Sequence, residues 1–120
     1  MIAASGLPRA RRLLTPAGYT AVFQHGCATR DAYFKVLAKP NGLPYARLGL
    51  AVSKRTSPKA VVRNRLKRHT RESFRLGQPA LAGLDIVVVS QGAASTGAAP
   101  ILRGSLNQHW QKIVKKCKKP

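Results

Sequence analysis

The sequence has very few acidic residues. Only three of its 120 residues are acidic (Asp31, Glu72 and Asp85), whereas 22 are Lys or Arg, which gives a formal net charge of +19 at pH 7. General acid–base catalysis and two-metal sites commonly use paired carboxylates, and three scattered acids form no obvious pair. The sequence also contains no G-x-S-x-G elbow and no P-loop. We therefore expect no catalytic residue and no metal site in the polypeptide itself.

Cysteine and histidine are scarce as well. Cys27 and Cys117 lie far apart and form no CxxC pair. A disulfide between them is conceivable, but nothing in the sequence supports one, so we expect two reduced thiols. The three histidines do not cluster with cysteine or acids at metal-ligand spacing. A phosphodiesterase site of His and Lys would need distant residues to converge, and it is the weaker alternative.

Long apolar segments are missing. The N-terminus has no apolar leader region, and no apolar run is long enough to span a bilayer. Together with reduced thiols, this predicts a soluble, cytoplasmic protein. A chain of 120 residues that is 44% hydrophobic suits one domain over residues 1–120 with a modest core. We expect a basic flexible arm at residues 1–14 and a basic tail at residues 114–120.

Positive charge is what the sequence has in excess. It points to nucleic acid as the first candidate partner and to an anionic membrane surface as the second. The charge peaks at residues 9–12, in the centre of the chain and at residues 112–119. The densest stretch, residues 53–75, holds nine of the 22 Lys and Arg residues and a single acid, Glu72.

Residues 53–75 are predicted to form a helix. Ser57 suits its N-cap and Pro58 its first position, and Gly77 and Pro79 fit a C-terminal stop. At 100° per residue, one side of the helix is apolar and the other carries a row of basic groups. Solvated helices usually alternate charges to gain i,i+4 pairs, and this face has almost no acid to pair with. An external polyanion is therefore favoured over a merely solvated face.

The remaining elements give an α+β pattern. A helix should run from Thr15 and Pro16 to about Gln24, with Tyr19 and Phe23 on one face. Periodicity alone favours a core role for this aromatic pair over base stacking. Strands are predicted at residues 32–38, 47–54 and 84–90, where Gly49 allows a close approach, followed by a loop at 91–99. A last helix opens at Pro100 and keeps helical spacing of its apolar residues, Leu102, Leu106, Trp110 and Ile113. Trp110 is expected in the core, with RNA stacking as the alternative.

Three segments then carry a family resemblance. Residues 59–68 read KAVVRNRLKR and follow a strand that reads LGLAVSK; this arginine–asparagine–arginine signature is highly specific in that order. LLTPAGYTAVFQHG upstream and DIVVVSQ downstream match in the same order. Over roughly residues 13–112, the chain resembles the protein subunit of bacterial ribonuclease P.

The resemblance implies the fold, the activity and the partners. The fold would be an α-β-β-β-α-β-α two-layer sandwich with a four-stranded mixed sheet and a left-handed crossover around the basic helix. The chain would be part of an endoribonuclease whose RNA subunit does the chemistry, removing the 5′ leader of precursor tRNA with bound Mg²⁺. The protein would bind that RNA and the single-stranded leader in the cytoplasm, without a membrane or an obligate protein partner.

The resemblance also implies two sets of binding residues. The set facing the RNA subunit is Lys59, Arg63, Asn64, Arg65, Lys67, Arg68 and Arg71. The set facing the precursor tRNA leader is Tyr19, Phe23, Phe34, Val36, Ser53, Lys54 and Arg55. This reading requires Tyr19 and Phe23 to be partly exposed. Some family members have an aromatic residue near the place of Leu37, so a third stacking contact is not expected here.

Two other functions remain open on the sequence. The chain could be a structural RNA-binding protein of another particle, such as the ribosome. It could also be a nucleoid-type DNA binder, although no helix-turn-helix pair and no zipper flanks the basic helix.

Overall fold

The computed structural model describes residue 12 and residues 16–117, and the order of its elements is the one predicted. The helices and strands are α1 (Pro16–His25), β1 (Cys27–Arg30), β2 (Phe34–Pro40), β3 (Arg47–Ala51), α2 (Ala60–Leu81), β4 (Leu84–Ser90), the 3₁₀ helix η2 (Gly92–Thr96) and α3 (Ala99–Cys117). Leaving η2 aside, this is α-β-β-β-α-β-α. The α+β class with a four-stranded mixed sheet is confirmed.

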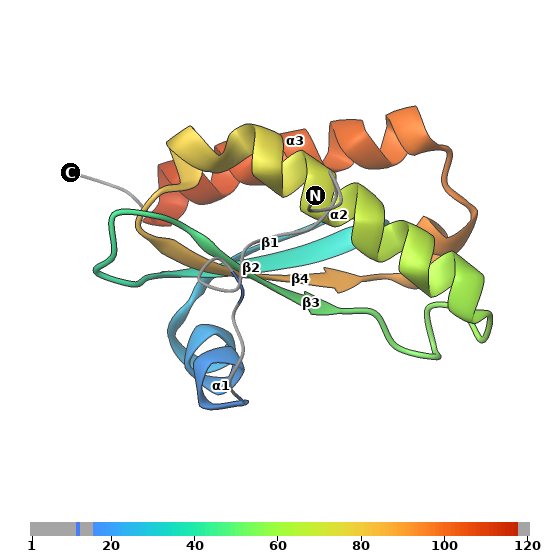
Figure 1. Cartoon of the computed structure of the whole chain (residues 1–120), viewed down its shortest axis with the longest axis horizontal. Helices are drawn as coiled ribbons and strands as arrows, with labels where there is room; N and C mark the ends of the chain where they lie inside the picture. Colours follow the sequence, from blue (N-terminus) through green and yellow to red (C-terminus); the bar gives the residue numbers. More distant parts are fainter. Residues whose placement is uncertain (1–11, 13–15, 118–120) are drawn as a thin grey trace, which may run out of the picture.

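The sheet has the strand order β1-β2-β4-β3. β2 is antiparallel to both β1 and β4, whereas β3 and β4 are parallel and are connected through α2. Figure 1 shows α2 and α3 side by side on one face of the sheet and α1 on the opposite face. The two faces of the sheet are thus covered by different helices, and each has its own hydrophobic cluster.

The main core lies between the sheet and the α2–α3 layer. Its fully buried side chains include one set from the strands and one from the helices: Phe34, Val36, Ile86, Val88, Leu66, Phe74, Leu102, Leu106 and Ile113. Trp110 is only 5% exposed, and its indole N–H donates to Ser73 Oγ over 2.9 Å. The prediction that Trp110 belongs to the core is confirmed.

The predicted ends of the basic helix were wrong by a few residues. The N-cap of α2 is Lys59, and Ser57 Oγ accepts the Lys59 N–H at 3.2 Å, which fixes the turn before the helix. At the other end, the helix passes Gly77 and Pro79 and stops at Leu81. Leu81 is fully buried, so packing holds the last turn in place. Gly83 ends the helix instead, with a φ of 87° that favours glycine.

The strands and the second loop also differ from the sequence reading. The residue patterns missed β1, which is only four residues long, although the resemblance implied a strand there. β2 begins at Phe34, and β3 ends at Ala51 rather than near Lys54. The segment predicted as a loop at 91–99 contains η2.

Cys27 and Cys117, predicted as two separate thiols, lie side by side. Their Cα–Cα distance of 6.0 Å is within the span of a disulfide, and they bring the start of β1 next to the end of α3. This pairing could not be predicted from the sequence, because the two residues meet only when α3 packs across β1 and β2.

The predicted arm and tail fall mostly outside the described residues. Of the arm, only Arg12 is described, and it forms a parallel bridge with Leu48 on β3. α3 extends through Cys117, so the first part of the predicted tail is helical. Among the helices that the structure describes, none has both the length and the apolar character needed to cross a bilayer.

Candidate nucleic-acid interface

The solvent-facing side of α2 carries cations that no carboxylate of the described chain neutralises. Asn64 and Arg68 are exposed, and Lys67 and Arg71 are partly exposed. The acid on this helix, Glu72, is paired with Arg75: Arg75 Nε and Nη2 donate to the two carboxylate oxygens of Glu72. Lys59 is exposed just before the helix. Dense like charges repel one another, and a row of phosphates would relieve that repulsion.

Arg63 and Arg65 lie on the two flanks of this face and are tied to the backbone. Arg63 Nη1 donates to the Ser57 carbonyl at 2.9 Å, and Arg65 Nη2 donates to the Ser95 carbonyl at 3.0 Å. They therefore hold the segment before α2 and the η2 segment against the helix. Each bond uses one nitrogen of a guanidinium group that has five N–H donors, so each group keeps other donors, although Arg65 Nε is buried. The sequence did not reveal these hydrogen bonds, because each arginine and its carbonyl are further apart along the chain than the three or four residues of one helical turn.

His69 lies beside the basic face, where its proton affinity is reduced. Burial, and then the positive charges of Arg103, Arg65 and Arg68, lower the pKa of the His69 imidazole. Arg103 comes from α3, so positive charge also reaches this side of α2 from the neighbouring helix. His69 is therefore favoured in its neutral form near neutral pH.

A second basic surface lies on the α1 face of the sheet. The register places Arg30, Lys35, Val89 and Ala51 across the four strands in one row. Arg30 is exposed, and Lys35 and Val89 are partly exposed. The next row on this face, Leu37 and Val87, is buried beneath Val22 of α1. The row of Arg30 and Lys35 therefore lies uncovered beside α1.

Tyr19 of α1 packs together with Val89 of this row on the same hydrophobic cluster. Tyr19 Oη accepts the N–H of Leu50 at 3.1 Å, and its ring lies so close to Gly49 that a Cβ there would be 2.7 Å from Tyr19 Cζ. The predicted close approach at Gly49 is confirmed. Phe23, one helical turn further along, is 47% exposed. Neither residue is a fully buried anchor; Val22, at 1% exposure, fills that role.

Phe34 and Val36 were wrongly assigned to the leader surface. Both are 0% exposed and belong to the main core beneath α2 and α3. Side chains alternate along a strand, so the residues of β2 that face α1 are Lys35 and Leu37. Leu37 is 4% exposed and packed under α1, so its side chain offers no stacking surface. Arg30 and Lys35 were missed, although the alternation of Lys35 with two apolar neighbours could have identified it.

Ser53, Lys54 and Arg55 are exposed in the connection that follows β3. The connection is anchored, because Thr56 Oγ1 donates to the Ser90 carbonyl at 3.0 Å and Ser53 Oγ accepts the Arg55 N–H at 3.2 Å. Since β3 ends at Ala51, this segment continues from the uncovered row. It adds two cations next to that row.

The carboxylates do not fit a magnesium site. Asp85 is held by Arg47 and Asn41, and Glu72 by Arg75. Asp31 accepts the Ser105 hydroxyl at 2.5 Å and two backbone N–H groups. Burial alone would raise the pKa of Asp31, but these hydrogen bonds and the charge of His109 lower it to about 2. Within residue 12 and residues 16–117, no three His, Cys, Asp or Glu side chains gather as metal ligands.

The family follows from comparison with known proteins. The model of the family described as Ribonuclease P matches residues 7–114. The chain belongs to the ribonuclease P protein family. The ribonuclease P protein component of Methylococcus capsulatus is 42% identical over 112 residues, which cover 93% of this chain and 88% of the relative.

Solved structures of ribonuclease P proteins share the fold. A Staphylococcus aureus ribonuclease P protein mutant, described as defective in mRNA degradation activity, superposes with a TM-score of 0.82 at 28% identity and covers 87% of this chain and 88% of its own. The Thermotoga maritima protein in complex with 1-(4-fluorophenyl)-2-thiourea gives 0.75 at 34% identity, with 83% and 98% covered. The chain is accordingly a protein subunit of ribonuclease P, an endoribonuclease whose family role is processing of the tRNA 5′ end. Membership also implies the ribonuclease P RNA as its partner.

Proposed function

We propose that the two basic surfaces divide the work of the subunit. The solvent face of α2 would bind the RNA subunit through Lys59, Arg63, Asn64, Arg65, Lys67, Arg68 and Arg71. The surface beside α1 would bind the 5′ leader of precursor tRNA. The observation that carries the proposal is that one sheet separates an unneutralised cationic helix from an uncovered row of cations on the face that carries α1 and its aromatic side chains.

The leader surface suits a single strand. Phe23 offers an exposed ring for a base, and Tyr19 lies beside it with its hydroxyl held at Leu50. Arg30 and Lys35 supply cations for the backbone. Stacking on aromatic rings next to a basic track is the usual way to bind single-stranded RNA without a strict sequence requirement. The cationic connection of Ser53, Lys54 and Arg55 extends the track beyond β3. This composition fits leaders of varied sequence.

The chain's contribution to cleavage would be electrostatic and positional. The catalytic groups and the Mg²⁺ ions would lie with the RNA subunit and the substrate, since each carboxylate here has a partner of its own. The cations of α2 and of the α1 face would reduce repulsion between the two RNAs. The work would take place in the cytoplasm, without a membrane or an obligate protein partner.

Reconstitution tests the proposal directly. The chain alone should not cleave precursor tRNA, but with the RNA subunit at low Mg²⁺ it should promote cleavage at the mature 5′ end. A substrate without a leader serves as the control for binding, because its affinity for the holoenzyme should not depend on the α1 surface. If adding the chain has no effect on cleavage or on substrate affinity, the division of work is wrong.

A further inference from the structure

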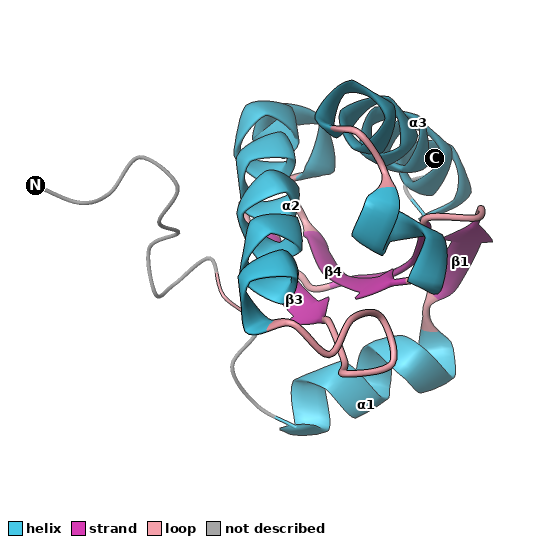
Figure 2. Cartoon of the chain, turned by 90° about the vertical axis from the view of Figure 1, so that its right-hand side faces the viewer, coloured by secondary structure: helices cyan, strands magenta, loops and turns pink. Residues whose placement is uncertain are grey.

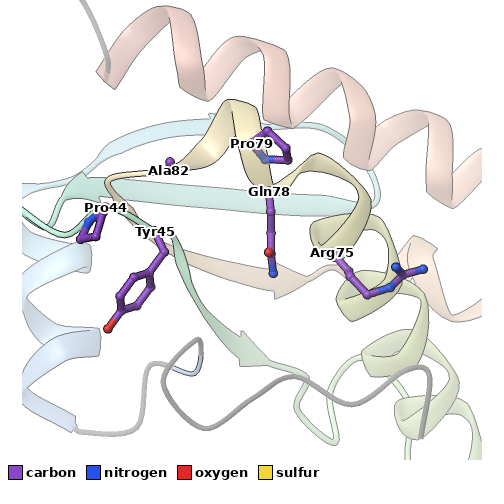
Figure 3. Close-up of a pocket in the computed structure, with 6 residues that line it drawn as sticks. All are labelled: Pro44, Tyr45, Arg75, Gln78, Pro79 and Ala82. Carbon is purple, nitrogen blue, oxygen red and sulfur yellow. The ribbon is translucent and has the colours of Figure 1, made fainter. Parts of the chain in front are cut away.

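A pocket of about 370 Å³ lies between the β2–β3 connection and the last turns of α2. We call it the Tyr45 pocket; its lining residues are Pro44, Tyr45, Arg75, Gln78, Pro79 and Ala82. Figure 3 shows Tyr45 and Gln78 projecting from the connection and from α2, with Pro44 and Pro79 nearby on the same two segments. Arg75 and Gln78 continue the basic side of α2, and the other four lining residues belong to neither surface described above.

The connection that carries Tyr45 is held rigidly. Asn41 Nδ2 donates to the Tyr45 carbonyl at 3.2 Å and to Asp85 Oδ1 at 2.9 Å. Asn41 Oδ1 accepts the Leu43 N–H at 2.8 Å, and the Asn41 N–H donates to Gly83 at 2.8 Å. One side chain therefore fixes the turn to the start of β4. A ring on a fixed backbone loses little conformational entropy when a ligand packs on it.

The chemistry of the lining suits a nucleotide. The rings of Tyr45, Pro44 and Pro79 give flat or apolar surfaces for a planar base. The Gln78 amide can both donate to and accept from a base edge. Arg75 can contact a phosphate, because its ion pair with Glu72 is exposed and such pairs exchange at little cost. A pocket of about 370 Å³ has room for one nucleotide rather than for a duplex.

The pocket continues the basic face of α2. Asn64, Arg68, Arg71, Arg75 and Gln78 follow one another at intervals of three or four residues, so they share one side of the helix. A strand that follows these cations toward the end of the helix reaches the pocket. The face supplies phosphate contacts, whereas the pocket supplies a surface for a base.

We propose that the Tyr45 pocket binds one unpaired nucleotide of the ribonuclease P RNA subunit, with its base on Tyr45 and its phosphate at Arg75. This rests on the proposed docking of that RNA along α2. The pocket would add a contact with an unpaired base to a surface that otherwise contacts phosphates. We use the term α2 dock for the proposed RNA-binding face of α2; the pocket would fix the position of the RNA at one end of this dock.

Equilibrium binding of the full chain to the ribonuclease P RNA of the same organism, transcribed in vitro, tests this. Tyr45→Ala should weaken binding by about five- to hundredfold, the range for loss of one base stack. Tyr45→Phe keeps the ring and should bind as the unmodified chain does. The slope of log affinity against log salt should stay the same in Tyr45→Ala, since no phosphate contact is removed. Gln78→Ala should also weaken binding. Because Gln78 is partly exposed on a helix, this variant tests the pocket independently of any folding defect in Tyr45→Ala.

Arg68→Ala separates the two proposals. If it weakens RNA binding while Tyr45→Ala and Gln78→Ala bind normally, the pocket is not used and the α2 dock stands. If all three variants bind normally, the dock itself is wrong. If Tyr45→Ala affects only precursor tRNA binding to the assembled holoenzyme, the nucleotide belongs to the substrate, and the assignment to the RNA subunit is overturned.

Discussion

At the scale of single residues, Gly49 makes room for the aromatic ring of Tyr19. A methyl group there would overlap the ring of Tyr19 at 2.7 Å, while the Tyr19 hydroxyl is bonded to Leu50. Glycine is thus required for contact with a side chain rather than for an unusual backbone angle.

Gly49→Ala should lower the free energy of unfolding by about 1–3 kcal/mol, as overpacking does, and should displace Tyr19. Chemical denaturation measures the first effect, and affinity for a leader-bearing precursor tRNA measures the second. Gly92→Ala is the matched control, because a Cβ at Gly92 meets nothing within 4 Å. Equal stability of the two variants would show that Tyr19 does not rest on Gly49.

Lys35 should contribute one phosphate contact to leader binding. Lys35→Ala should reduce the steepness of log affinity against log salt by about 0.7, the single-strand value for one contact. Lys39→Ala is the control, because Lys39 lies on the same face of β2 but on the far side of the buried Leu37 row. A reduction of the same size in both variants would mean that the row of Arg30 and Lys35 is not the leader track.

His69 should make RNA binding depend on pH. Burial and three arginines lower its pKa in the free protein, and phosphates at the α2 face would raise it again. Binding would then take up a proton, so affinity for the RNA subunit should increase as the pH falls from about 8 to about 5.5. His69→Gln should flatten that dependence; an identical pH profile in the variant would place the phosphates away from this flank.

At the scale of elements, the β1–β2 turn is fastened to α3 through Asp31. Its carboxylate accepts the Ser105 hydroxyl and lies 3.2 Å from His109 Nε2, while Thr29 Oγ1 lies 2.6 Å from His109 Nδ1. His109 and Thr29 are buried. This polar network is therefore one of the links between the first strand and the last helix, beside the pairing of Cys27 with Cys117.

Acid should loosen this attachment. The pKa of Asp31 is lowered to about 2, below its ordinary value of 3.8, so its contribution is present above about pH 4 and is lost as the pH falls toward 2. Asp31→Asn should cost about 2 kcal/mol of stability at neutral pH, the order expected for hydrogen bonds to a charged group. It should also remove part of the stability change between pH 4 and pH 2. Thermal unfolding at several pH values measures both, and an unaltered acid transition would show that the network does not titrate.

Much of this element plan could be predicted from the sequence. The 3.6-residue periodicity of α2 and α3 identified these helices, because each buries one side against the sheet. The continuous apolar run of β4 identified this strand, because it is buried along nearly its whole length. The short β1 could not be found in this way, since four residues carry little periodicity. Phe34 and Val36 were placed on the wrong face because a motif gives positions, whereas the side of the sheet depends on which helix covers it.

The same limit explains what was missed at the site. The cations of α2 were evident from spacing alone, but the backbone tethers of Arg63 and Arg65 join segments far apart in the chain. Arg30 and Lys35 became a pair only through the register of β1 against β2. Contacts between distant segments have no signature in a single sequence.

At the scale of the whole molecule, the sheet sets the relation between the two proposed RNA partners. Figure 2 shows α2 and α3 on one side of the strands and α1 on the other. Both hydrophobic clusters are packed on the same hydrogen-bonded sheet, one on each face, so the α2 face and the α1 surface cannot move independently of each other. The protein would hold the leader at a fixed position relative to the catalytic RNA.

At this scale, the separation of charge between the two surfaces predicts that the two RNA contacts have separate salt dependences. Arg68 and Arg71 replaced together by Ala should reduce the salt slope for the RNA subunit by about 1.4 to 1.8, that is, two phosphate contacts. Binding of the leader to the assembled holoenzyme should keep its own salt dependence. If the double variant changes the leader slope and leaves the RNA-subunit slope intact, the two surfaces have been assigned the wrong way round.

The contacts of β3 with Tyr19 and Arg12 have a consequence for self-association. β3 is an edge strand, and an unpaired edge is a template on which a second sheet can build. Here the Tyr19 hydroxyl occupies the N–H of Leu50, and Arg12 pairs with Leu48. The Tyr19 hydroxyl thus covers part of the sheet edge, so its loss would expose the protein to aggregation through β3.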